Sequence, residues 1–253
     1  MNTAKGESSS DTPNATQVKQ ESAWDGVKGF FWVILFALTV RWLLVEPYRI
    51  PSGSMIPSLA VGDQIFVNKL SYGVRVPFTT NQLIEFSEPR RGDVAVFVCP
   101  DTPDLNYIKR IVALAGDQVL VKDGVLTING KVLERADLGT KMFQDRHFES
   151  STWFQFDATE HGETNHGAQY SVLADDARPA PTRDFGPFVV PEGHVFMMGD
   201  NRDHSRDSRV FGAVPVGHIM GRAMFVWWSW GKDGFETQRI GLSLAPKYLE
   251  SPL

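Results

Sequence analysis

Hydrophobic and polar positions divide the chain into a polar start, one long apolar run and a series of short alternating runs. Residues 1–23 are rich in Ser, Thr, Asn, Lys and Glu and contain almost no large apolar side chains. Such a segment buries too little apolar surface to offset the entropy that it would lose on ordering. The pattern therefore predicts a disordered tail over residues 1–23.

Residues 29–45 are almost continuously apolar, and Arg41 is their one charge. As a helix rising about 1.5 Å per residue, this run would extend about 25 Å, slightly less than the roughly 30 Å hydrocarbon core of a bilayer. Arg41 lies near enough to one end to reach the headgroups, and Trp24 and Trp42 are typical interfacial anchors. The pattern predicts one transmembrane anchor over residues 24–46.

Two other interpretations of this run differ in strength. A cleaved signal peptide fits less well, because Glu21 and Asp25 precede the run and no small-residue cleavage site follows it. A helix buried in a protein core stays open as an alternative, since the run is short for a span and carries an arginine. The flanking charges are mixed and do not set an orientation.

Beyond residue 59 the hydrophobic pattern becomes that of β-strands. Runs of β-branched and aromatic residues cover 65–67, 94–98, 194–198 and 223–230. Residues 119–133 predict a meander, in which 122–124 and 129–130 supply typical turn residues. We therefore expect a mostly β protein of antiparallel sheets that follows one N-terminal transmembrane helix.

Residues 134–184 interrupt this pattern with a polar, irregular stretch, which we interpret as an insertion on the β body. The expected divisions are a first part of the β core at 47–133, an inserted and partly irregular subdomain at 134–187, and a second part of the core at 188–253. His161 and His166 lack the spacing of a zinc-binding helix, so we interpret them as surface residues.

Three tryptophans mark the last long run. In an extended strand, Trp228 and Trp230 share one face and Trp227 lies on the other. The cluster therefore predicts both a side that packs in the core and a side that faces the membrane.

Composition and charge narrow the function only slightly. A net charge of −5 without long charge runs gives no indication of nucleic-acid binding. The single cysteine, Cys99, excludes a disulfide within the chain and a multi-cysteine metal site. Its apolar neighbours predict an inert core thiol.

The turn at residues 47–59 is the strongest candidate for chemistry. Pro51 and Pro57 stiffen its two sides, and Gly53 permits backbone angles that other residues avoid. Ser54 follows Gly53 and has apolar neighbours. A rigid hydroxyl in apolar surroundings suits a nucleophile if a base lies within reach. A proline-bracketed turn with incidental serines is the alternative.

Two lysines are candidates for that base. If its segment is extended, Lys109 shares a face with Tyr107 and Ile111. Desolvation lowers the pKa of a lysine in such a setting, and a neutral amine is a competent general base. Lys69 has similar neighbours, so composition does not choose between the two.

Other serine-based arrangements have less support in the sequence. No histidine combines an apolar setting with an obvious acidic partner, which weakens the case for a Ser-His-Asp triad. Pro57 occupies the position where a Ser-x-x-Lys enzyme of the penicillin-binding type needs its lysine.

Three segments together resemble the characteristic boxes of bacterial type I signal peptidases. They are IPSGSMIPSL at 50–59, YIKRIV at 107–112 and GDNRDHSRDSR at 199–209, in the family's order and behind an apolar run. The resemblance covers residues 40–120 and 188–232 and is weak in the tail and in 134–184.

The resemblance implies a role for each matching residue. Ser54 is implied as the nucleophile, Lys109 as its general base, Ser52 as an oxyanion donor beside the Ser54 amide, and Ser205 as the group that orients the lysine amine. Pockets for small side chains at the first and third positions before the cleaved bond are implied for Tyr48, Ile50, Met55, Leu59, Tyr107 and Ile108. Structural positions beside the site are implied for Arg110, Gly199, Asp200, Asp207 and Arg209.

The resemblance also implies a function and a place. Members remove signal peptides from exported precursor proteins at the outer face of the bacterial inner membrane, close to the export translocon. For this chain that implies a single-pass protein with its catalytic domain on the periplasmic side and with no metal, cofactor or nucleic-acid partner. Some members differ from this sequence in having two anchors or a disulfide in the insertion.

Two other functions remain open. One is a Ser/Lys peptidase of the conjugation or self-cleaving type. The other is a non-catalytic, membrane-tethered β scaffold that binds exported chains through residues 227–230 and does not need Ser54.

Overall fold

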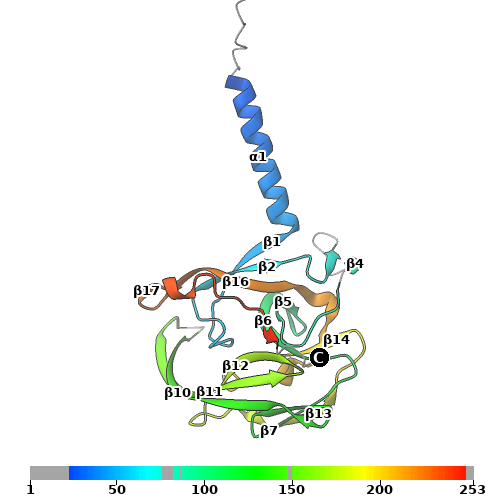
Figure 1. The fold of residues 1–253 in the computed structure, drawn as a ribbon, viewed down its shortest axis with the longest axis vertical. Helices are drawn as coiled ribbons and strands as arrows, with labels where there is room; N and C mark the ends of the chain where they lie inside the picture. The colour runs from blue at the N-terminus through cyan, green and yellow to red at the C-terminus, as the bar shows by residue number, and fades with distance from the viewer. Residues whose placement is uncertain (1–22, 76–81, 86, 148–149, 249–253) are drawn as a thin grey trace, which may run out of the picture. The chain divides into compact units, whose positions relative to one another are not determined.

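The computed structural model describes residues 23–75, 82–85, 87–147 and 150–248 (Figure 1). The chain divides into two units, residues 1–40 and residues 41–253. The disordered tail predicted for residues 1–23 lies, apart from its last residue, outside the described residues.

Helix α1 (Ala23–Leu43) forms where the sequence predicts a helix. Its described side chains are exposed, and Phe30 and Phe36 expose 68% and 72% of their surface. Among the residues that the structure describes, however, no helix has both the length and the apolar character needed to cross a membrane. The helix is confirmed and its transmembrane character is not. The side chains of Arg41 and Trp42, on which the anchor prediction drew, are outside the described set.

The largest sheet contains most of the strands that the sequence predicts. It has eight strands, seven of them in the order β1-β2-β16-β5-β6-β14-β15, and β17 pairs with β16. Every pair in it is antiparallel. Its strands are β1 (Val45–Arg49), β2 (Asp63–Asn68), β5 (Val94–Cys99), β6 (Thr102–Leu114), β14 (His194–Met198), β15 (Val214–Pro215), β16 (Ile219–Gly231) and β17 (Gly234–Phe235).

Three smaller sheets complete the second unit, and their pairs are antiparallel as well. One has the order β13 (Phe185–Val189), β7 (Gln118–Lys122), β8 (Val125–Ile128), β9 (Lys131–Val132). Another has the order β10 (Glu134–Arg146), β11 (Trp153–Asn165), β12 (Ala168–Ala174), β18 (Lys247–Tyr248). β3 (Gly73–Arg75) pairs with β4 (Gln82–Glu85). The prediction of a mostly β, antiparallel protein is confirmed.

The predicted meander is present because its turns carry the residues that tight hairpins need. Asp123 and Gly124 join β7 to β8, and Asn129 and Gly130 join β8 to β9. All four have positive φ angles, between 50° and 77°. Two consecutive residues of positive φ form the hairpin turn that matches the twist of the flanking strands, and Asp-Gly and Asn-Gly favour it.

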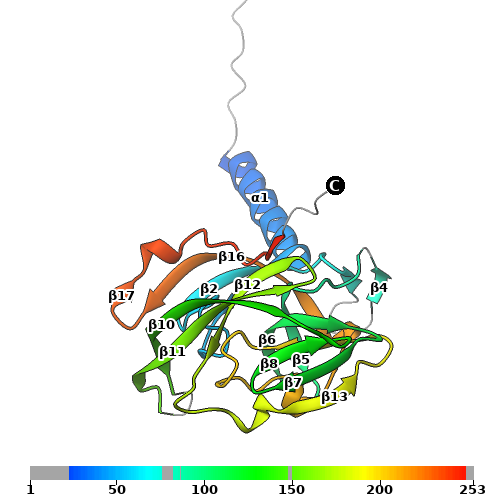
Figure 2. The same ribbon diagram turned by 60° about the horizontal axis from the view of Figure 1, so that its bottom comes forward.

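The stretch after residue 134 is much more regular than expected, and its longest described part without a strand is residues 175–184. β10 and β11 are 13 residues long each and pair along almost their whole length, and Figure 2 shows β10, β11 and β12 running side by side. The sequence hides β10 because only Asp145 on that strand is buried. With no buried apolar side of its own, the strand lacks the alternating hydrophobic pattern that identifies a strand.

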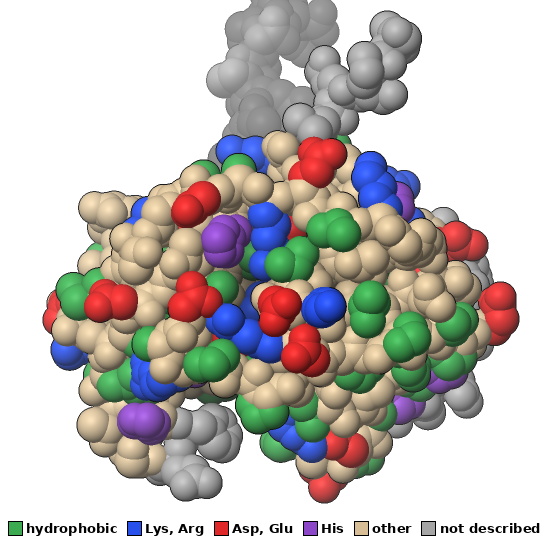
Figure 3. All heavy atoms as spheres, turned by 90° about the horizontal axis from the view of Figure 1, so that it is seen from below, with side chains coloured by type: hydrophobic (Ala, Val, Ile, Leu, Met, Phe, Trp, Pro, Cys, Tyr) green, Lys and Arg blue, Asp and Glu red, His purple; other side chains and the backbone are tan. Residues whose placement is uncertain are grey.

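The core of the second unit is divided into clusters between the sheets. The largest fully buried side chains include Phe97, Phe196, Leu126 and Met197. Trp228 and Trp230 share an exposed face, as predicted, and expose 37% and 58% of their surface. The prediction for Trp227 is wrong, because β16 has a bulge between residues 226 and 228 and Trp227, which is half-buried, stacks on Phe66 at 5.3 Å instead of lying in the core. On the face seen from below, acidic and basic side chains lie close together (Figure 3).

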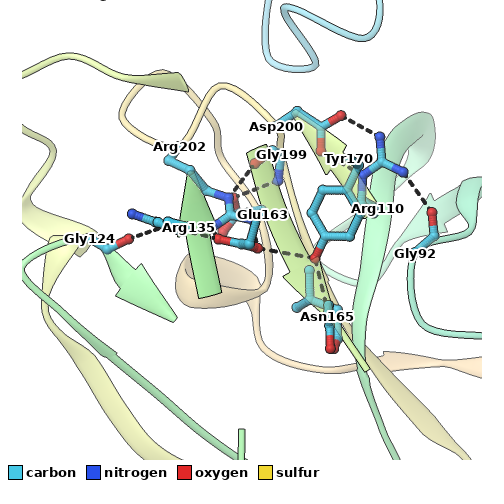
Figure 4. A network of polar contacts seen from close by, with 12 residues as sticks. Gly92, Arg110, Gly124, Arg135, Glu163, Asn165, Tyr170, Gly199, Asp200 and Arg202 are labelled. Carbon is cyan, nitrogen blue, oxygen red and sulfur yellow. Dashed lines mark hydrogen bonds and ion pairs between the residues drawn. The ribbon is translucent and has the colours of Figure 1, made fainter. Parts of the chain in front are cut away.

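A buried polar network joins two of the sheets (Figure 4). Glu163 on β11 has no exposed surface, and Arg202 donates to its two carboxylate oxygens at 2.6 and 2.9 Å. Arg135 on β10 donates to the same carboxylate at 2.9 and 3.0 Å. Burial alone would raise the pKa of Glu163, but the two guanidinium groups outweigh it and lower the pKa to about 2.

Tyr170 on β12 extends this network to the main sheet. Its hydroxyl donates to Glu163 at 3.1 Å and accepts from Asn165 at 3.2 Å. The guanidinium of Arg110, on β6, lies 4.3 Å from the centre of its ring. Arg110 in turn donates to Asp200 at 2.6 and 2.8 Å. The β10–β12 sheet is thereby fixed against β6 and against the loop that begins at residue 199.

We expect Glu163→Gln to lower the free energy of unfolding at neutral pH by about 3 kcal/mol, because buried guanidinium charge is left uncompensated. Since the folded pKa of Glu163 is below its unfolded value, its contribution is present above the unfolded pKa and is lost as the pH falls towards about 2. Denaturant titrations at neutral and acidic pH test both points. Tyr170→Phe, which removes one hydroxyl, serves as a control with a loss of about 1 kcal/mol. Equal stability of Glu163→Gln and wild type at neutral pH would contradict the expectation.

Candidate active site

The turn that carries Ser54 is fixed by backbone hydrogen bonds and by buried side chains. The amide of Ile56 donates to the carbonyl of Gly53 at 3.1 Å, and the amide of Leu59 donates to the carbonyl of Met55 at 2.9 Å. Met55 and Leu59 have no exposed surface, because they pack into the cluster between β2, β5 and β16. The apolar residues of the turn therefore point inwards and hold Ser54, which is half-buried, at its surface.

Strand β6 brings Lys109 to Ser54. Lys109 pairs with Ala95 on β5, is 4% exposed, and places its Nζ 2.6 Å from Ser54 Oγ, in a hydrogen bond. Its Nζ also lies 5.7 Å from the centre of the Tyr107 ring. A hydroxyl and an amine from distant segments are thus in direct contact within an otherwise apolar setting.

The environment of Lys109 favours its neutral form. Burial lowers the pKa of Lys109 to about 8, although the carboxylates of Asp207 and Asp200 act in the opposite direction. Those two carboxylates are each paired with an arginine, Asp200 with Arg110 and Asp207 with Arg209, at 2.6 and 2.8 Å. They therefore do not form ion pairs with the lysine amine, and desolvation is the larger effect.

The choice between the two candidate lysines is settled by tertiary structure. Lys69 lies at the end of β2, half-buried, 3.4 Å from the carboxylate of Glu46. It is thus part of a surface ion pair, whereas Lys109 is buried against Ser54.

The loop over residues 199–209 packs directly on the turn. A Cβ on Gly199 would overlap both the Ser205 side chain and the carbonyl oxygen of Ser54, so only glycine fits there. The Gly199 amide donates to Asp207 at 3.0 Å, and Asp207 also caps the short helix α2 (Ser208–Phe211). Asp207 and its partner Arg209 are buried. The buried ion pair between Asp207 and Arg209 therefore fixes the loop.

Asn201 is a residue of this loop to which the sequence assigned no role. Its side-chain amide donates to the carbonyl of Gly53 at 3.1 Å, and its backbone amide donates to the carbonyl of Ser54 at 3.2 Å. It therefore fastens the turn to the loop. Asn201 lies in the segment 199–209 that resembles the family, which marks it as a candidate, but nothing in the sequence indicates which residues it contacts.

Two further predicted polar residues, Ser52 and Ser205, also lie near the site. Ser52 is half-buried in the bend that precedes Ser54. The Ser205 hydroxyl helps to lower the pKa of Asp207, yet within the described part of the chain it makes no hydrogen bond of ordinary geometry, to Lys109 or to any other group. The structure therefore brings Ser205 to the site but does not join it to the amine.

The six residues predicted to line pockets divide between two clusters. Ile50, Met55 and Leu59 form the buried part of one cluster, and Tyr48 and Ile108 pack against it from partly exposed positions. Tyr107 packs instead beside Phe97 and Phe211. Ile50, Met55 and Leu59 are buried and lie beneath the surface, so only Tyr48, Tyr107 and Ile108 are partly open to a ligand.

Comparisons with known proteins identify the family of this chain. The family model of "Signal peptidase, peptidase S26" matches residues 23–228. The chain belongs to the signal peptidase family, peptidase S26. The resemblance seen in the sequence is thereby confirmed, and the chain is a serine peptidase.

Three curated relatives illustrate the likeness. Signal peptidase I of Pseudomonas fluorescens is 43% identical over 216 residues, which are 80% of this chain and 72% of the relative. Signal peptidase I of Pseudomonas aeruginosa is 40% identical over 216 residues, which are again 80% of this chain and 72% of the relative. Signal peptidase I of Rickettsia typhi is 35% identical over 249 residues, which are 92% of this chain and 90% of the relative.

We expect kcat/KM of this signal peptidase family member to rise with pH through a single limb near 8. Lys109 must be neutral to accept a proton, and burial lowers its pKa to about 8, whereas a solvated lysine titrates near 10.4. The rate is therefore low where Lys109 is protonated and reaches a plateau above the limb. Peptide hydrolysis measured at subsaturating substrate from pH 6 to 10 gives the profile. A flat profile would exclude Lys109 as the titrating base. A limb near 6.5 that vanishes on replacing a histidine would identify that histidine as the base.

Proposed function

We propose that this protein removes signal peptides from exported precursors with Ser54 as nucleophile and Lys109 as general base. The observation that carries the proposal is the 2.6 Å contact between Lys109 Nζ and Ser54 Oγ, made by a lysine that is 4% exposed. The names of the relatives, signal peptidase I, support the same substrate class.

The first half of the reaction forms an ester between the signal peptide and Ser54. Lys109 takes the hydroxyl proton while Oγ attacks the scissile carbonyl carbon. The negative charge that develops on the carbonyl oxygen is stabilised by the Ser54 amide and the Ser52 hydroxyl. The C–N bond then breaks, and the Lys109 ammonium returns its proton to the nitrogen of the departing mature chain.

The second half returns the enzyme to its starting state. A water molecule loses a proton to Lys109 and attacks the ester carbonyl, through an oxyanion held by the same two donors. The Ser54–carbonyl bond breaks, Ser54 recovers a proton from Lys109, and the signal peptide leaves with a free carboxylate. The cycle uses no metal or cofactor. Ser205 supports the loop beside the lysine, and Arg110 and Arg209 keep the nearby carboxylates occupied.

The apolar residues around the turn suit a substrate with small side chains at the first and third positions before the cleaved bond. Tyr48 and Ile108 are partly exposed above a fully packed floor that includes Met55 and Leu59. A floor without spare volume favours small side chains, because a large one would force buried residues to move. Tyr107, whose ring centre is 5.7 Å from Lys109 Nζ, completes the lining, and Ile50 belongs to the buried floor.

The protein acts at a membrane surface in this proposal. Apolar side chains of α1, from Trp24 to Leu38, are largely exposed, which is unfavourable in water. We assign this helix to lipid at the inner membrane, with the β unit on the periplasmic side and the export translocon nearby. Trp228, Trp230 and Phe235 form a second exposed apolar surface on the β unit, with Trp228 and Phe235 in contact at 4.5 Å.

We expect Ser54→Ala and Lys109→Ala to abolish precursor processing while the protein stays folded. Lys109→Arg is expected to be equally inactive, because a guanidinium does not deprotonate at working pH. Incubation of an exported precursor with each variant, with the cut site identified by mass spectrometry and folding checked by circular dichroism, tests the assignment. Lys69→Ala is the matched control and keeps wild-type processing. Near-wild-type turnover by a folded Ser54→Ala protein would exclude a catalytic serine at this position.

We expect the full chain to sediment with membranes and to resist carbonate extraction, because the exposed apolar side chains of α1 are more stable in lipid than in water. Fractionation followed by alkaline extraction measures this. A variant in which Phe30 and Phe36 are both replaced by Asp should move to the extracted fraction. Recovery of the wild-type chain in the soluble fraction would argue against membrane attachment.

A further inference from the structure

The side-chain amide of Asn201 points at the carbonyl of the residue before the nucleophile. Its Nδ2 donates to the Gly53 carbonyl at 3.1 Å. Asn201 has no exposed surface, and in the part of the chain that the structure describes its Oδ1 has no hydrogen-bond partner. The reverse orientation of the amide would set two oxygens against each other. Because a buried acceptor without a partner costs free energy, stability alone does not explain this side chain, and the bond to Gly53 is the contact that accounts for it.

Strand β12 holds Asn201 in place independently of its side chain. The Leu173 amide donates to the Asp200 carbonyl at 2.8 Å, and the Arg202 amide donates to the Leu173 carbonyl at 3.0 Å. These two bonds lie on the two sides of Asn201 and pair it with Leu173 in a parallel bridge. The Asn201 backbone amide also donates to the Ser54 carbonyl at 3.2 Å. The side chain therefore extends from a backbone whose hydrogen bonds do not depend on it.

The bond to Gly53 acts on the peptide that contains the Ser54 amide. The Gly53 carbonyl and the Ser54 N–H belong to one planar peptide and point in opposite directions, so fixing the carbonyl fixes the direction of the N–H. This carbonyl accepts from the Ile56 amide, within the turn, at 3.1 Å and from Asn201, outside the turn, at the same distance. Asn201 ties the peptide to the 199–209 loop and, through Leu173, to the β10–β12 sheet.

We propose that Asn201 is a positioning residue that aims the Ser54 amide at the oxyanion of this peptidase. It does not touch the substrate; it holds the Gly53–Ser54 peptide in the plane from which the amide donates to the tetrahedral intermediate. The inference rests on the proposed function, in which that amide is an oxyanion donor. Because the asparagine amide carries no charge, it acts without altering the protonation of Lys109.

The experiment compares Asn201→Ala and Asn201→Leu with the matched controls Asn165→Ala and Asn165→Leu. Asn165 also has no exposed surface, and its Nδ2 donates to a backbone carbonyl as well, that of Val112 on β6, at 2.8 Å. We expect both Asn201 variants to lower kcat by about 10- to 100-fold with KM changed less than about threefold, because the Ile56 bond remains and the oxyanion donor is misaligned rather than lost. Both Asn165 variants keep kcat near wild type.

A binding measurement separates positioning from a general loss of structure. The probe is a peptide with alanine at the first and third positions before the cut, ending in an aldehyde. Ser54 Oγ adds to the aldehyde carbon, its proton passes through Lys109 to the former carbonyl oxygen, and that oxygen occupies the oxyanion position. The same peptide ending in a primary amide binds without bond formation. We expect the Asn201 variants to lose aldehyde affinity by the same factor as kcat and to keep their affinity for the amide peptide.

The pH dependence gives a second readout that a merely structural role would not preserve. We expect the rising limb of kcat/KM in both Asn201 variants to stay at its wild-type position while the plateau falls. No charge near Lys109 has changed in these variants, so the equilibrium between its two protonation states is the same.

The inference is overturned if the Asn201 variants lose affinity for both peptides equally, if their kcat falls no further than that of the Asn165 variants, or if the pH limb shifts together with the loss of rate. If Asn201→Ala does not fold, Asn201→Leu decides, because leucine fills the space without a donor; if neither folds, the fold itself requires Asn201 and the inference is overturned as well. Failure of the proposed function gives a different result, namely processing by Ser54→Ala. Inactive Ser54→Ala together with fully active Asn201→Leu would overturn this inference alone.

Discussion

The proposed mechanism depends on keeping the amine of Lys109 uncharged although two carboxylates lie nearby. Lys109 lies close enough to Asp200 and Asp207 for both to favour its charged form, and yet burial lowers its pKa to about 8. This balance holds because each carboxylate has an arginine as its partner. A guanidinium stays protonated at any physiological pH, so it neutralises an acid permanently, while the lysine is left to respond to desolvation.

The main sheet and the β10–β12 sheet both contact the turn that carries Ser54. Arg110 donates to Ser58 at 3.0 Å, to the Gly92 carbonyl at 2.6 Å and to Asp200, which fixes β6 against the turn. Ile56 packs with Phe156 and Leu173 of the β10–β12 sheet. The turn is therefore a junction between sheets, and its precision comes from contacts that are distant in sequence.

Features that depend only on neighbouring residues could be predicted from the sequence, and features that depend on distant segments could not. The hairpin turns at 123–124 and 129–130 were predictable because residue type alone sets their backbone angles. The face of Trp228 followed from the period of a strand. Lys109 and Lys69 were not distinguishable, because burial is decided by which strands pair. β10 was missed because its one buried residue, Asp145, is a carboxylate, so the strand carries no alternating apolar side. The bond expected between Ser205 and Lys109 is absent from the described structure, although both residues are at the site.

Lys109 and Arg110 are adjacent on β6, so the register of this strand decides which of them faces Ser54. Neighbouring residues of a strand point to opposite faces, so one face receives an amine that must lose its proton and the other a cation that never does. Opposite them on β5 are Ala95 and Val94. A slip of one residue in one direction would set the Arg110 guanidinium against Ser54, and a slip in the other direction would set Lys109 beside Asp200 and Ile108 against Ser54. Under the proposed mechanism neither arrangement supplies a base, so a chain that pairs these strands wrongly would be inert.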